Sequence, residues 1–222
     1  MIDIRQFFKV TKISFVEKTN EHNDVHTFAF ASEKKLHHIA GQHGIFILPK
    51  FKGIHIFSLA SAPEEKNILI GTHAREGSHY KTTLSALKSG DTMTLVGPVM
   101  NFILDKRIKN VVFLAQGIGI TPFRSILMHK KLTGLSVNCT LIHVDSQEHT
   151  YREISENIAD ITYYPVNPEE FTQNVTSVVS QQDAGTAYYV SGSPRFVKAT
   201  KQTLQNLGVA KRSIKKDGFL GY

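Results

Sequence analysis

The sequence contains a single cysteine and no long apolar run. One thiol, Cys139, excludes a disulfide framework and a four-cysteine iron–sulfur cluster within this chain. It lies in the apolar stretch 137–144, which predicts a buried structural thiol. No apolar segment approaches the roughly 18 residues that a membrane-spanning helix needs. Because Asp3 and Arg5 interrupt the N-terminal stretch, we expect no signal peptide, no membrane association and a cytoplasmic location.

Signatures of nucleic-acid binding and of metal binding are also missing. The formal net charge of +7 favours an anionic partner, but the lysines and arginines are scattered, and no helix-turn-helix, zinc-finger or RNA-binding motif occurs. We therefore expect no nucleic-acid partner. The eleven histidines show neither an HExxH motif nor a matched carboxylate spacing. We expect no metal site and predict that the histidines lie in loops, with His37, His38 and His43 as the densest group.

The first half of the chain is predicted to form short strands. Runs rich in β-branched and aromatic residues are separated by turn signals, at residues 7–16, 24–31, 44–48, 54–61, 67–74 and 92–98. One helix is predicted over residues 80–90, where Leu84 and Leu87 lie three apart and Gly90 can end it. This pattern favours a small antiparallel barrel or sandwich.

The second half of the chain has a different rhythm. Continuous apolar strands are predicted at residues 108–116, 137–144, 161–166 and 186–192, with a further strand in the tail 213–222. Helices are predicted between them, at residues 123–132, 152–158, 168–181 and 194–208. This alternation indicates a parallel sheet with helices on both faces. We place the domain boundary between residues 104 and 105.

The glycine-rich stretch QGIGITPF, residues 116–123, connects the first strand of the second half to a helix. Gly117 and Gly119 permit backbone angles and a close approach that a side chain would block. Thr121 can cap the helix, and Pro122 suits its first turn. The turn either only connects the two elements or exposes free N–H groups to a phosphate. Its place at the carboxyl end of a parallel strand favours the ligand.

The stretch GIHIFSLASAP, residues 53–63, alternates in character. Ile54 and Ile56 point to one face of the predicted strand, and His55 and Phe57 point to the other. The second pair either packs within the barrel or faces a ligand.

Six motifs occur in one order: GQHGIFIL, IHIFSLASAP, GDTMTLVGP, GIGITP, YYVSGSP and DGFLGY. Through them, the chain resembles the ferredoxin–NADP reductase superfamily from about residue 8 to Tyr222, without a fused ferredoxin or haem domain. The resemblance implies an N-terminal antiparallel Greek-key β-barrel that binds flavin, residues 1–104. An α/β parallel-sheet domain that binds NAD(P), residues 105–222, follows it.

The resemblance also implies flavin-binding residues. Phe57 would flank the flavin, Ser58 would lie near flavin N5, and His55 would face the phosphate, where the family has arginine. Histidine cannot form the bidentate arginine clamp on a phosphate. Further flavin contacts are implied for Thr72, His73 and Ala74, and for Thr82 and Thr83 at the start of a phosphate-binding helix. The alternative for the two threonines is simple helix capping.

The nucleotide-binding residues follow from the same resemblance. The family's pyrophosphate turn corresponds to Gly117, Gly119, Thr121 and Pro122. Ser191 replaces a cysteine beside the nicotinamide, and Gly192, Ser193 and Pro194 keep the turn and helix start that follow. Tyr222 would cover the flavin, unless it is a frayed tail. The candidate catalytic residues are therefore Ser58, Ser191 and Tyr222.

The implied function is a flavin-dependent NAD(P)H oxidoreductase. It would take hydride from NADH or NADPH onto FAD, with FMN less expected, and pass electrons to a separate acceptor. That acceptor would be a small molecule, an oxygenase component, or an electron-carrier protein such as an acidic ferredoxin or flavodoxin. Asp145 at a strand end favours NADH by accepting hydrogen bonds from ribose hydroxyls, unless it only caps a turn. The alternatives are a non-catalytic regulatory subunit that binds flavin or nucleotide, and a nucleotide-binding domain without flavin.

Overall fold

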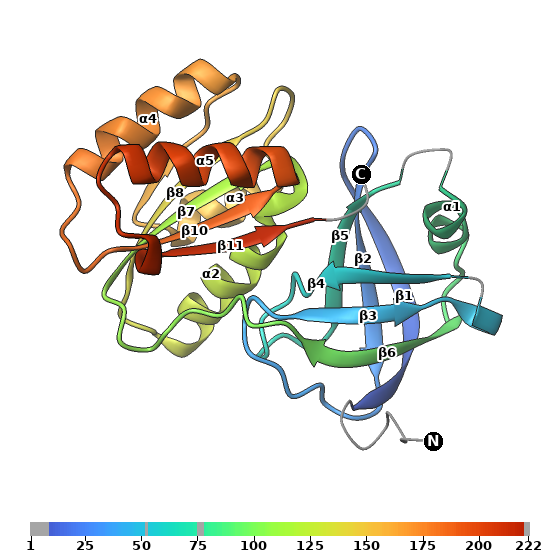
Figure 1. The fold of residues 1–222 in the computed structure, drawn as a ribbon. Coiled ribbons are helices and arrows are strands. Elements are labelled where there is room, and N and C mark those ends of the chain that lie inside the picture. The colour runs from blue at the N-terminus through green and yellow to red at the C-terminus, as the bar shows by residue number, and fades with distance from the viewer. Residues whose placement is uncertain (1–8, 52, 75–77, 220–222) are drawn as a thin grey trace, which may run out of the picture. The chain divides into compact units, whose positions relative to one another are not determined.

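The computed structural model describes residues 9–51, 53–74 and 78–219. The chain forms two compact units that divide between Ile103 and Leu104. The first unit is built on an antiparallel sheet and the second on a parallel sheet with helices (Figure 1), which confirms the predicted fold class. None of the helices in the described ranges has the length and apolar character that a membrane crossing requires.

The N-terminal unit is a six-stranded antiparallel sheet in the order β4-β3-β6-β1-β2-β5. Its strands are β1 (Val10–His22), β2 (Val25–Ser32), β3 (His43–Ile47), β4 (Ile54–Ser58), β5 (Ile68–His73) and β6 (Thr92–Val99). The two edge strands approach one another, because the Ala60 amide just after β4 donates to the Leu69 carbonyl of β5 at 2.8 Å. The sheet therefore curls into the predicted barrel. A 3₁₀ turn, η2 (Pro49–Phe51), and one helix, α1 (His79–Ser85), complete the unit.

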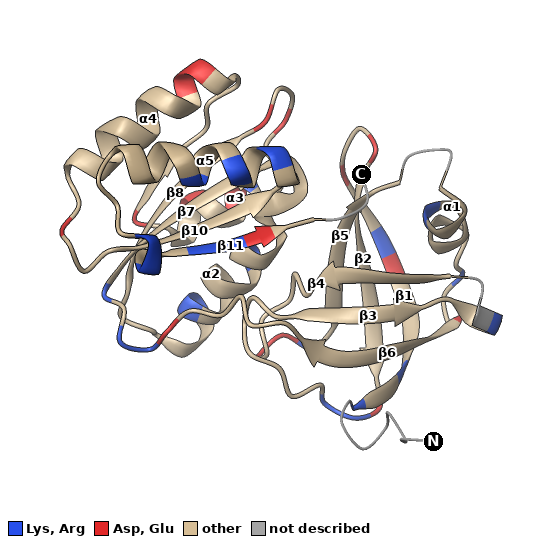
Figure 2. Ribbon diagram, in the orientation of Figure 1, with Lys and Arg blue, Asp and Glu red and all other residues tan. Residues whose placement is uncertain are grey.

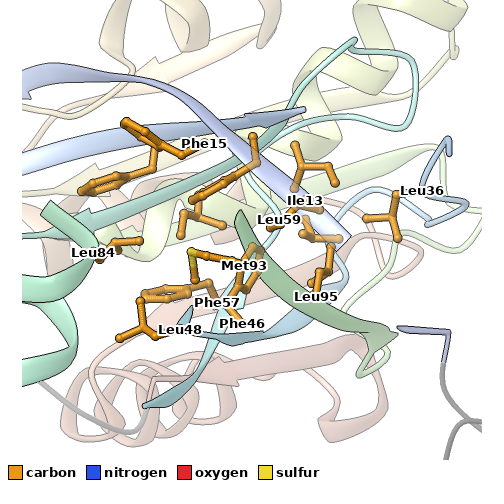
Figure 3. Packing of buried hydrophobic residues seen from close by; sticks show 14 of the residues in the cluster. Ile13, Phe15, Leu36, Phe46, Leu48, Phe57, Leu59, Leu84, Met93 and Leu95 are labelled. Atoms are coloured by element: carbon orange, nitrogen blue, oxygen red, sulfur yellow. The ribbon is translucent and has the colours of Figure 1, made fainter. Parts of the chain in front are cut away.

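The barrel core is rich in aromatic rings. Phe28 and Phe30 of β2 are both 0% exposed, and Phe15 of β1 packs edge-on against Phe30 with ring centroids 5.8 Å apart. Figure 3 shows Phe46 and Phe57 in the same cluster, together with aliphatic side chains from the other strands. Alternation along the strands directs these side chains to one face, as the sequence pattern predicts.

The C-terminal unit is a five-stranded parallel sheet in the order β11-β10-β7-β8-β9. Its strands are β7 (Asn110–Gln116), β8 (Asn138–Val144), β9 (Ile161–Tyr163), β10 (Ala187–Gly192) and β11 (Ile214–Gly218). The helices are α2 (Thr121–Thr133), α3 (Arg152–Ile158), α4 (Pro168–Ser180) and α5 (Pro194–Asn206), with 3₁₀ turns η3 (Gly117–Ile120) and η4 (Lys211–Ser213). The strand order reverses between β7 and β10, which makes their carboxyl ends the switch point of the sheet.

Helices cover both faces of the parallel sheet (Figure 1). One face packs against α4 and α5, whose buried residues include Phe171, Val175 and Leu204. The other face packs against α2, where Phe123 stacks on Phe113 of β7 at 4.6 Å. Cys139 of β8 is 0% exposed, and burial raises the pKa of its thiol to about 12, so the predicted structural thiol is confirmed.

Phe28→Ala should lower the free energy of unfolding of the barrel by about 3–5 kcal/mol, because it leaves a cavity in a closed aromatic core. Ile54→Ala is the matched control, since Ile54 is 62% exposed, and should change stability by less than about 0.5 kcal/mol. Urea titration followed by circular dichroism measures both. A loss under about 1 kcal/mol for Phe28→Ala would contradict the described core.

Candidate functional site

The glycine turn lies at the switch point of the parallel sheet. The chain leaves β7, forms η3 and enters α2 directly. Gly117 has a φ of +50°, in the left-handed region that favours glycine. A Cβ on Gly119 would lie 2.4 Å from the Ser191 carbonyl oxygen of β10, so only glycine fits there. The turn therefore packs directly on the neighbouring strand end, where ligands of such sheets bind.

The ends of β7 and β10 are joined by a hydrogen bond between side chains. The Ser193 hydroxyl donates to Gln116 Oε1 at 2.6 Å and accepts from the Phe196 amide at 3.2 Å. Ser193 is the N-cap of α5 and Pro194 its first residue, as the sequence predicts. Gly192 has a φ of +155°, and a Cβ there would meet the Gln116 Cβ at 2.9 Å. Gln116 was not singled out from the sequence, because its partner lies 77 residues away.

Ser191 carries a buried hydroxyl beneath the turn. The residue is 0% exposed, and its Oγ has no hydrogen-bond partner among the described groups. Leaving a buried polar group unsatisfied costs about 1–3 kcal/mol. A ligand group that enters the switch point could satisfy this hydroxyl.

Thr121 has a different role from the one its sequence position predicts. Its hydroxyl donates to the Ile118 carbonyl within the turn, and the N-cap position of α2 is occupied by Ile120, without a side-chain cap. The prediction that Thr121 caps the helix is therefore wrong, because η3 runs into α2 without an extended residue between them. Pro122 lies in the first turn of α2, as predicted.

Asp145 follows β8 and lies beside the glycine turn. Its Oδ1 accepts a hydrogen bond from the Gln147 amide at 3.1 Å, so the turn-capping alternative is present in the structure. Its Oδ2 lies 3.6 Å from the position of a Cβ on Gly117. One carboxylate oxygen thus holds the loop, and the other lies beside the turn.

In the barrel, His55 and Phe57 share one face of β4, as predicted. Their rings stack with centroids 4.4 Å apart and 12° between planes. Phe57 is only 7% exposed and points into the core cluster (Figure 3), where it packs against Tyr80 of α1 at 5.8 Å. Its packing in the barrel agrees with the alternative interpretation, and its contact with flavin stays a prediction. Ile56 on the opposite face is 45% exposed.

Ser58 has a buried partner that the sequence interpretation missed. The Ser58 hydroxyl lies 3.1 Å from Nε2 of His43, and the two residues are 5% and 2% exposed. The prediction that His43 lies in a loop is wrong, because it begins strand β3 and pairs with Ser58 across the sheet. The signal was its place in the motif GQHGIFIL, one of the six that carry the resemblance.

Thr72, His73 and Ala74 lie at the far end of β5 from its contact with residue 60. Thr72 is buried, and His73 Nδ1 lies 3.2 Å from Asp24 Oδ1. The Ala74 amide donates to the Asp24 carbonyl at 2.7 Å. These three residues and Ser58 therefore mark opposite ends of the two edge strands.

Helix α1 begins earlier than the sequence predicts. Ser78 is its N-cap and accepts from the Lys81 amide at 3.4 Å, and the Thr82 amide already donates to the Ser78 carbonyl at 2.9 Å. Thr82 and Thr83 therefore lie within the helix, and the prediction that they begin or cap it is wrong. The remaining candidate, Tyr222, lies outside the described residues.

The two-domain fold is shared with solved reductases. The ferredoxin–NADP⁺ reductase from Neisseria gonorrhoeae, solved with bound FAD and NADP, has a TM-score of 0.80 over 95% of this chain and 98% of its own, at 18% identity. A ferredoxin reductase of carbazole 1,9a-dioxygenase has a TM-score of 0.83 over 96% and 70%, at 14% identity. The predicted resemblance to the ferredoxin–NADP reductase superfamily is confirmed.

Sequence relatives are reductase components and flavohemoproteins. The reductase component of propane 2-monooxygenase from Rhodococcus jostii is 27% identical over 207 residues, which cover 81% of this chain and 55% of that protein. A flavohemoprotein from Oceanobacillus iheyensis is 26% identical over 188 residues, covering 73% and 46%. The chain thus spans about half the length of these curated relatives. No family model matches it.

Gly119→Ala should destabilise the C-terminal unit by about 1–3 kcal/mol, because the new methyl group meets the backbone of β10 and one of the two segments must move. Gly185→Ala is the matched control, since a Cβ there meets only the Asp183 carboxylate at 3.3 Å. The urea midpoints of both variants test this. Equal midpoints would contradict the close packing of the turn on β10.

Proposed function

We propose that the chain is a flavin-dependent NAD(P)H oxidoreductase that takes hydride from NADH or NADPH onto FAD and passes electrons to a separate acceptor. The observation that carries the proposal is the glycine turn packed on β10 at the switch point, downstream of an antiparallel barrel. Bound FAD and NADP in a solved protein of the same fold support the choice of cofactors.

The residues at the switch point fit a nicotinamide nucleotide. The first N–H groups of a helical turn have no carbonyl partner within that turn, and here they begin at Gly117. Such groups bind phosphates well. The buried Ser191 hydroxyl offers a donor and an acceptor to a polar ring substituent. Gln116 and Ser193 satisfy one another, so their contribution is to hold the two strand ends together rather than to contact the nucleotide.

The barrel residues fit an elongated flavin. Ser58 at one end of the edge strands and His73 at the other suit a ring and a phosphate tail, respectively. When bound, the flavin accepts an electron pair with hydride and releases electrons singly. The hydrogen bond between His43 Nε2 and Ser58 Oγ allows this buried pair to hold or move a proton at Ser58 Oγ. His55 offers the phosphate one ring face and one polar edge, instead of the arginine fork.

The proposed acceptor is an acidic electron-carrier protein or an oxygenase component. Figure 2 shows lysines and arginines on α5, η4 and β11 of the C-terminal unit. The exposed ones are Arg195, Lys198, Lys211, Arg212 and Lys216. Such a surface attracts an anionic partner and raises its association rate. The reductase component of a monooxygenase among the relatives is consistent with this class of acceptor.

The purified protein should contain a flavin that bleaches when NADH or NADPH is added without oxygen. Visible absorption spectra measure both properties. Gly119→Ala is the control: it alters only the C-terminal unit, so the flavin should stay bound while bleaching requires more nucleotide. A colourless protein that neither retains nor rebinds FAD or FMN would overturn the proposed function.

Asp145 should make NADH the preferred nucleotide, because its Oδ2 can accept a ribose hydroxyl and repels a 2′-phosphate. Asp145→Ser should lower the ratio of kcat/KM for NADH to that for NADPH by roughly tenfold. Glu148→Gln removes a charge three residues away and controls for general electrostatics. If the wild type prefers NADPH and Asp145→Ser leaves the ratio unchanged, Asp145 does not recognise the ribose.

A further inference from the structure

Two polar side chains lie in one row beneath the glycine turn. In the parallel sheet, Ala115 of β7 pairs with His143 of β8 on one side and with Ser191 of β10 on the other. Both His143 and Ser191 are 0% exposed. Because paired residues of neighbouring strands point to the same face, this row lies on the face that α2 covers. Ser191 belongs to the site already described, whereas His143 has no assigned role.

His143 donates a hydrogen bond to the turn itself. Its Nε2 lies 2.9 Å from the carbonyl oxygen of Gly117. Because a carbonyl oxygen can only accept, Nε2 must carry the proton. The ring is held in place by two other rings, His149 at 5.2 Å and Tyr164 at 6.5 Å between centroids. His149 itself lies 3.3 Å through Nε2 from the Pro165 carbonyl, so the supporting ring is also fixed.

This bond determines which way one peptide unit of the turn faces. In a trans peptide, a carbonyl and the following N–H point in opposite directions. With the Gly117 carbonyl held toward His143, the Ile118 N–H is directed away from it. Glycine at residue 117, with a φ of +50°, has the freedom to let this peptide unit turn over. A fixed donor below the carbonyl removes that freedom.

We propose that His143 is a positioning residue that orients the Gly117–Ile118 peptide for binding the pyrophosphate of the nucleotide. The inference rests on the proposed function, since it assigns a second layer to the same site. His143 does not contact the nucleotide in this proposal. It acts only through the Gly117 carbonyl, so a side chain of the same reach with an N–H donor should replace it.

The test compares variants of the full chain by calorimetric titration with ADP-ribose, which carries the pyrophosphate but no nicotinamide. His143→Phe removes the donor and should weaken ADP-ribose binding about fivefold. His143→Gln places an amide N–H at the same number of bonds from Cα and should restore the affinity to within about twofold of wild type. Cys139→Ala, a buried change on the same face of β8, controls for general loss of packing and should leave the affinity unchanged.

The outcomes separate this inference from the function on which it rests. If wild type binds neither ADP-ribose nor NAD(P)H, the proposed function and the inference both fail. If wild type binds ADP-ribose and His143→Phe binds it equally well, only the inference fails. Should His143→Phe not fold, His143→Met, a flexible residue without a donor, replaces it, and unchanged affinity in that variant overturns the inference. Equal weakening by His143→Gln and His143→Phe would also overturn it.

Discussion

The close approach of Gly119 to the Ser191 carbonyl is the constraint on which the C-terminal unit depends. A backbone that passes within contact distance of a neighbouring strand leaves no room for any side chain, so residue 119 must be glycine. The approach closes the gap between β7 and β10 at the point where the strand order reverses. Gly192 answers the same constraint from the other strand, because its missing side chain makes room for Gln116. The hydrogen bond from Ser193 to Gln116 then joins the two strand ends.

The barrel satisfies a different requirement, which is to hold polar groups at the ends of an aromatic core. Its edge strands meet at Ala60 and Leu69, and Ser58 lies just before this contact. The Ser58 hydroxyl is nearly sealed from solvent and would be costly without a partner, which His43 supplies. At the other end, the Tyr80 hydroxyl donates to the Phe46 carbonyl at 3.1 Å, and burial raises the pKa of Tyr80 above its usual value. The core is thus apolar in its middle and hydrogen-bonded at both ends.

Most of the fold could be predicted from local patterns. Strands of β-branched and aromatic residues, and their alternation with helices after residue 108, have a period that any window of the sequence reveals. Element ends were harder to place: the helix predicted over residues 80–90 spans His79–Ser85, and the strand predicted over 161–166 ends at Tyr163. Thr82 was misplaced because a threonine is a plausible cap, whereas Ser78, four residues earlier, makes the capping bond. Local sequence does not decide between two such candidates.

The site was predictable only where one motif contains both a residue and the reason for it. The glycines of GIGITP are of this kind, since their conformation and their neighbour in the chain explain them. Gln116, His43 and His143 are of the other kind, because each acts on a segment that folding brings close: Ser193 on β10, Ser58 on β4 and Gly117 in the turn. No spacing rule reveals such pairs, and a histidine without a metal pattern is easily assigned to a loop.

The positions of the three site histidines suggest how their chemistry is divided. His43 and His143 are buried and each binds one fixed group, a hydroxyl or a carbonyl, so their role is to orient that group. His55 is only half-buried and stacks face to face on Phe57, with its Nδ1 3.0 Å from the Ile56 carbonyl. That bond leaves Nε2 as the polar atom available for an incoming phosphate. A single imidazole nitrogen can bind one phosphate oxygen but cannot clamp two, and the remaining phosphate contacts must come from backbone N–H groups.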